Sequence, residues 1–241
     1  MDANKDQTSI LGNAKPSQAI VKLALPATLA LLAKAVYNIV DTAYIGMLGS
    51  DIALTAVGVT VPLLLIMVSI ENIFAAGAAV LAGRQLGAKD EEGASRTVTT
   101  IIGLSIVIGA VLCVGGIVFI EPLMRAFGAS DASLSLAEDY AFWMFVAALA
   151  NLPAQSMNCA ARAESSVKIS SIAVITGALL NVVLDPIFMF DWGLGMGVEG
   201  ASLATTVSQF VTFFILAWFY LSGRSVIKLH LGCLLYTSDA A

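Results

Sequence analysis

The chain has 241 residues, of which 59% are hydrophobic and only 12% are charged, and its mean hydropathy is +0.90. Soluble domains carry about 25% charged residues, so this composition excludes a soluble globular protein and leaves a polytopic membrane protein. The net charge of −5 adds little, because the distribution of Lys and Arg matters more than their sum in membrane proteins.

Six apolar runs are each long enough to cross about 30 Å of hydrocarbon as a helix. Clusters of glycine and polar residues separate the runs, as expected for turns. In chain order the predicted spans are 19–47, 57–81, 98–120, 140–161, 169–190 and 201–221. The sequence therefore predicts an all-α polytopic membrane protein whose fold is a six-transmembrane-helix bundle.

The lysines and arginines lie almost entirely on one side of these spans. Lys34 falls deep within a span and Arg125 lies in an external link, whereas all the others lie in the remaining links and tails or, like Lys22, at the cytoplasmic end of a span. Positive residues concentrate on the cytoplasmic side, so we predict that the amino terminus and the carboxyl-side tail are cytoplasmic.

The expected organisation of the chain follows from these spans. A cytoplasmic amino-terminal segment at 1–18 precedes the six-helix lobe at 19–221, and a cytoplasmic tail follows at 222–241. From about residue 231 the tail shows no helical periodicity and resembles translated adaptor sequence. A truncated gene is therefore expected.

Two carboxylates, Asp41 and Asp185, fall within the first and fifth spans. Asp41 lies nineteen positions after Lys22, and Asp185 lies seventeen positions after Lys168. These separations correspond to about 28 and 26 Å along a helix, which places both acids at nearly the same depth. A charge in hydrocarbon costs at least about 2.5–3.5 kcal/mol, so each acid is a candidate functional residue.

Each acid also has a polar neighbour one helical turn away. Asn181 precedes Asp185 by four positions, and Tyr37 precedes Asp41 by four, so each pair shares a helix face. This arrangement suits a group that binds and releases a proton or a small cation. The alternative is that both acids end their helices in water, since Asp before Pro186 is a common helix-stop pair.

Lys34 and Glu71 form a second pair of candidates. Both lie roughly 18–20 Å from the cytoplasmic side, on spans that we expect to form an antiparallel hairpin. A buried ion pair between them is the preferred interpretation, because membranes tolerate charges mainly when they are paired. The alternative is that Glu71 faces a cavity and receives a cationic substrate.

Prolines and amides mark a bend and a cavity wall. Pro26 interrupts the first span, where it is either a bending point or an ordinary first-turn proline. Pro153, Gln155 and Asn158 cluster on the fourth span and predict that this span lines a cavity.

Several segments resemble one family of transporters, the multidrug and toxic compound extrusion (MATE) family, and most closely its prokaryotic DinF-like branch. Their order and spacing both fit over roughly residues 15–225. The matching segments are YNIVDT at 37–42, GRQLGAKD at 83–90, RAE at 162–164, NVVLDPIF at 181–188 and GVEGASLAT at 197–205.

The resemblance implies a twelve-helix fold of two lobes that exports organic compounds, often cationic, in exchange for H⁺ or Na⁺. It implies no cofactor other than this coupling ion, no nucleic acid, and as partners the lipid bilayer, a small organic substrate and a missing carboxyl-terminal lobe. It makes Pro26 the bending point of the first helix. The implied cation site comprises Tyr37, Asp41, Asn158, Asn181, Asp185 and Thr205, with Na⁺ expected at Asp41, Asp185, Asn181 and Thr205.

Three other functions compete with an efflux antiporter. A lipid-linked precursor flippase would have a basic cavity, whereas Lys34 is the only Lys or Arg in the spans, against three acids. This excess of acids favours cationic or neutral cargo. An intramembrane zinc protease would need a histidine cluster, and His230 is the only histidine. The buried carboxylates also count against a non-transporting scaffold.

Overall fold

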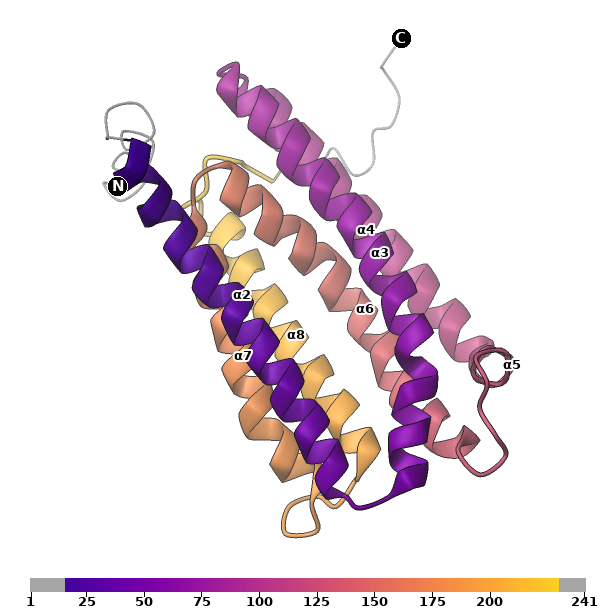
Figure 1. The fold of residues 1–241 in the computed structure, drawn as a ribbon. Coiled ribbons are helices and arrows are strands. Elements are labelled where there is room, and N and C mark those ends of the chain that lie inside the picture. The colour runs from indigo at the N-terminus through magenta and orange to yellow at the C-terminus, as the bar shows by residue number, and fades with distance from the viewer. Residues whose placement is uncertain (1–15, 230–241) are drawn as a thin grey trace.

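The computed structural model describes residues 16–229, with side chains from residue 24 onward. Most of the predicted cytoplasmic segment 1–18 and the tail beyond about residue 231 lie outside the described residues. Within them the chain forms six long helices, one short helix and no strand (Figure 1). The helices are α2 (Pro16–Met47), α3 (Asp51–Gly87), α4 (Glu91–Val118), α5 (Ile120–Ala126), α6 (Leu134–Ala163), α7 (Val167–Met189) and α8 (Val198–Leu221).

The helices α3 and α4 begin before the predicted spans because capping residues, not apolar residues, set their starts. The Ser50 side chain accepts a hydrogen bond from the Ala53 backbone and begins α3 six residues before the predicted span. Asp90 caps α4 in the same way through the Gly93 N–H at 2.8 Å. The short helix α5 was not predicted; α4 ends at Val118 and the chain begins a separate turn of helix.

Five of the six long helices are long and apolar enough to cross a membrane. The other, α6, has the required length but carries Asn151, Gln155 and Asn158 in its second half. It nevertheless packs against α3, α4, α5, α7 and α8 and has the most buried residues among the described helices. Neighbouring helices therefore surround α6, and the six-helix architecture is confirmed.

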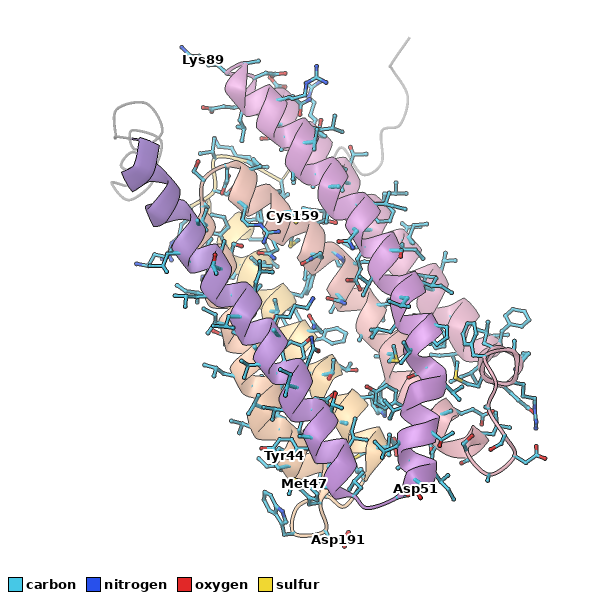
Figure 2. The ribbon with its side chains drawn as sticks, in the orientation of Figure 1. Tyr44, Met47, Asp51, Lys89, Cys159 and Asp191 are labelled. Carbon is cyan, nitrogen blue, oxygen red and sulfur yellow. The ribbon has the colours of Figure 1, made fainter. Side chains whose placement is uncertain are left out.

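The bundle has two distinct ends. Lys89, in the α3–α4 turn, lies at one end, while Met47, Asp51 and Asp191 lie at the other (Figure 2). We call these the Lys89 end and the Asp51 end. The amino-terminal end of α2 also lies at the Lys89 end (Figure 1), in agreement with the predicted separation of the loops.

The expected packing of the first two spans is wrong. The helices α2 and α3 are antiparallel and joined by a short link, but they make few contacts, and α2 packs mainly along α7 (Figure 1). Among the described side chains of α2, only Ala30 and Ile45 are buried. The reason is that α3 packs against α6 and α4 instead, where its small residues Ala56, Ala78 and Ala82 are buried.

Close contact between the end of α7 and the start of α8 positions the residues that follow. A Cβ on Gly200 would lie 2.6 Å from the backbone carbon of Phe188, so only glycine allows this approach. Thr205 lies five residues further along α8, and its hydroxyl accepts a hydrogen bond from Asn181 of α7.

Candidate functional site

Asp185 is completely buried within α7, which continues past Pro186 to Met189. The interpretation that Asp185 ends its helix in water therefore does not describe this structure. Asn181 Nδ2 donates to Asp185 Oδ1 at 3.0 Å and to Thr205 Oγ1 at 3.1 Å. This network joins α7 to α8 and brings together three of the predicted site residues.

Asp41 approaches this network from α2. It is half-buried, six residues before the helix ends, and lies within electrostatic reach of Asp185. Tyr37 and Tyr140 also lie within electrostatic reach of both acids. The structure thus groups Asp41, Asp185, Asn181, Thr205 and Tyr37 in one region between α2, α7 and α8.

Three oxygen atoms in this region are buried and have no hydrogen-bond partner among residues 16–229. They are Asp41 Oδ1, Asp185 Oδ2 and Asn181 Oδ1. Buried acceptors in folded proteins are nearly always satisfied, so these oxygens indicate a missing donor or cation. Carboxylate and amide oxygens suit a hard cation as well as a proton. The residues present therefore fit the Na⁺ set that the resemblance implies.

A small apolar cluster separates the acids from the Asp51 end. Ile45, Met189 and Ala201 form its buried centre, with Tyr44 and Tyr140 packed against them. Tyr140 is a residue of this region that the sequence analysis missed. Its hydroxyl within a predicted span was the available signal, but nothing in the sequence predicted that it would pack against Ile45 and Met189.

A cavity of about 140 Å³ lies among α2, α6, α7 and α8. Of the predicted residues, Tyr37, Asn158, Asn181 and Thr205 line it, together with Lys34, whereas Asp41, Asp185 and Glu71 do not. The prediction that the fourth span provides a cavity wall agrees with this placement. Its α6 lining consists of Asn151, Ala154, Gln155, Asn158 and Arg162.

Asn158 lies apart from the acidic network. Its Oδ1 accepts a hydrogen bond from Ser170, and its Nδ2 donates to Gln155 Oε1 at 3.4 Å. The structure thus links Asn158 to the start of α7 rather than to either carboxylate.

Pro26 is half-buried within α2, which is helical on both sides of it.

The predicted Lys34–Glu71 ion pair is not formed among the described side chains. Glu71 is buried on α3, and its Oε1 accepts a hydrogen bond from Asn151 Nδ2 of α6 at 2.5 Å. Lys34 is exposed on α2 and lines the cavity. The pair fails because α2 packs against α7, which leaves Asn151 as the partner of Glu71. All ion pairs in the described part of the chain are exposed: Arg96–Glu92, Arg125–Glu121 and Arg125–Asp131.

Fold and site together define a helical membrane lobe with acidic residues buried between its helices. The MatE family model matches residues 26–187, and the chain belongs to this family. As expected from the resemblance, it belongs to a family of transporters rather than enzymes.

Curated proteins and solved structures that resemble this chain are named as transporters or as MATE proteins. The multidrug export protein MepA of Staphylococcus aureus is 26% identical over 89% of this chain and 47% of its own length. An FAD transporter of Shewanella oneidensis is 28% identical over 86% of this chain and 46% of its own length. A crystal structure of MATE in complex with MaL6 is 29% identical, covers 90% of this chain and 48% of that chain, and has a TM-score of 0.85. The chain spans about half the length of the relatives that it matches.

Proposed function

We propose that this chain is the amino-terminal lobe of a secondary efflux transporter that exports small organic compounds in exchange for H⁺ or Na⁺. A second six-helix lobe is its proposed partner, and its amino terminus lies in the cytoplasm of a prokaryotic cell. Membership of the MatE family supports export, and the MepA relative is named for multidrug export. The main support for ion coupling is the group of buried oxygens on Asp41, Asp185 and Asn181 that lack a hydrogen-bond partner among the described residues.

In this proposal the two acids form one cation-binding site. Uptake of H⁺ or Na⁺ from outside neutralises negative charge between α2 and α7, which favours closer packing of these helices around a dry site. An ion can drive this change only if its affinity differs between the two conformations. The loose packing of α2 supports this role, because a helix with few buried side chains can move at low cost.

Asn181 and Thr205 act as fixed members of this site. Their hydrogen bonds tie α7 to α8, so the oxygen positions on these two helices stay constant while α2 approaches or withdraws. Asp41 is the member that moves with α2. The coupling ion is the only cofactor in this proposal.

Transport by the full-length protein that carries this lobe tests the proposal. In proteoliposomes, an imposed inward gradient of H⁺ or of Na⁺ should drive the export of a fluorescent organic dye. Separate gradients at fixed pH or fixed Na⁺ identify the ion, and ionophores that collapse each gradient provide the control. A rate of dye export that is the same with and without each gradient would contradict ion-coupled export.

A further inference from the structure

Two charged residues line the cavity, and both are cationic. Lys34 lies on α2 beside Tyr37, and Arg162 lies in the last turn of α6, towards the Lys89 end. No Asp or Glu lines the cavity, as described. The three acids of the predicted spans, Asp41, Glu71 and Asp185, are thus not part of the cavity lining, whose charged residues are basic.

Neither cation forms an ion pair with the described side chains. Lys34 lies within electrostatic reach of Glu71, but the Glu71 carboxylate is buried and bound by Asn151. Arg162 Nη2 donates to Cys159 Sγ at 2.8 Å, which leaves its charge uncompensated. An arginine that is half-buried beside a cavity can bind an oxyanion through two parallel N–H groups.

Two buried hydroxyl groups on the cavity wall also lack a partner. Ser171 on α7 is 5% exposed and Ser208 on α8 is 3% exposed, and neither Oγ forms a hydrogen bond in the described structure. Burying a hydroxyl without a hydrogen-bond partner is unfavourable, so such groups are rare unless a ligand satisfies them. Both hydroxyls can donate to a ligand oxygen.

We propose that this cavity binds the oxyanion group of an organic substrate, a carboxylate or a phosphate. Lys34 and Arg162 supply the positive charge, while Ser171 and Ser208 donate hydrogen bonds. A cavity of about 140 Å³ is smaller than the roughly 300–1,000 Å³ of pockets that enclose whole drug-sized ligands, so it holds one functional group of a larger molecule. This inference rests on the proposed export function and reverses the sequence-based preference for cationic or neutral cargo.

Binding of three small ligands that share a phenyl ring tests the charge preference. Benzoate and phenyl phosphate carry the two oxyanions, and benzylammonium carries the opposite charge. With the purified 241-residue chain in nanodiscs of uncharged lipid, calorimetry should give at least one oxyanion an affinity about tenfold or more above that of benzylammonium. The tighter of the two oxyanions identifies the substrate class.

Variants then assign the binding to the cavity. Arg162→Gln should lower the affinity of the preferred oxyanion about tenfold, and Arg162→Lys should retain most of it because the charge remains. Lys34→Gln provides a second variant at an exposed position that the fold tolerates. Arg125→Gln is the matched control, because it removes an equal charge from an exposed site outside the cavity and should change nothing.

Three results would overturn the inference. They are equal or tighter binding of benzylammonium, no saturable binding of either oxyanion, or unchanged oxyanion affinity in both Arg162→Gln and Lys34→Gln. Gradient-driven export without oxyanion binding would reject the anion site and leave the proposed function intact. Oxyanion binding without gradient-driven export would reject the proposed function and leave the anion site.

Discussion

The helices α2 and α6 reverse the usual relation between hydropathy and burial. The apolar helix α2 has two buried side chains among those described, and Leu25, Leu31 and Ile39 are exposed on it. The more polar α6 packs against five other helices and has buried residues from Ala137 to Ala161. In a membrane lobe, hydropathy therefore reports contact with lipid, and polar residues mark the helix that other helices enclose.

The same comparison separates what holds the lobe together from what can move. The packing of α6 depends on small residues and on bonds such as that between Asn151 and Glu71. The helix α2 carries Asp41 and Lys34 but is attached mainly along α7. We therefore expect changes around α6 to affect stability and changes on α2 to affect transport.

A large effect on stability is expected where α4 meets α6. A Cβ on Gly109 of α4 would lie 2.8 Å from the carbonyl oxygen of Ala148 on α6. This oxygen belongs to the helix backbone, so relieving the clash requires one helix to shift. Gly109→Ala should destabilise the chain by about 1–3 kcal/mol, measured as a lower midpoint of thermal unfolding in detergent.

Gly115→Ala, on the same helix, is the matched control. A Cβ at Gly115 meets nothing within 4 Å, so this change should be neutral or stabilising by up to about 1 kcal/mol through helix propensity. Equal destabilisation by the two substitutions would show that α6 does not depend on this close approach.

A smaller effect is expected at the end of α6, where Glu164 is buried in the link to α7. Its Oε2 accepts hydrogen bonds from Ser225 Oγ at 2.7 Å and from the Val226 and Ile227 backbone at 3.0 and 3.1 Å. Burial raises the pKa of Glu164 above its ordinary value of 4.5, although these hydrogen bonds oppose the shift. Between pH 4.5 and the raised pKa, Glu164 therefore keeps its proton in the folded chain but has lost it in the unfolded chain.

This difference makes the Glu164 contribution to stability fall as pH rises from about 4.5 through the raised pKa. Glu164→Gln should remove that part of the pH dependence, so the unfolding midpoint of the variant should decline less than that of the wild type over this range. Parallel midpoint curves for the two proteins would contradict a raised pKa at Glu164.

The sequence predicts local features of this lobe well and tertiary partners poorly. Asn181 and Asp185 are four residues apart on one helix, so helix geometry alone brings them together. The partner of Glu71 is 80 residues away, and the choice of Asn151 over Lys34 depends on how α3 packs. Arg162 was assigned to a cytoplasmic link because basic residues usually mark loops, yet it lines the cavity.

The central claim is that Asp41 and Asp185 form one coupling site across α2 and α7. Gradient-driven dye export by the full-length transporter in proteoliposomes tests it most directly, with Asp41→Asn, Asp185→Asn and the exposed control Asp191→Asn compared at equal reconstitution. The proposal predicts that each of the first two substitutions abolishes the dependence of export on the ion gradient and that Asp191→Asn retains it. Gradient-driven export at the wild-type rate in either Asp41→Asn or Asp185→Asn would contradict it.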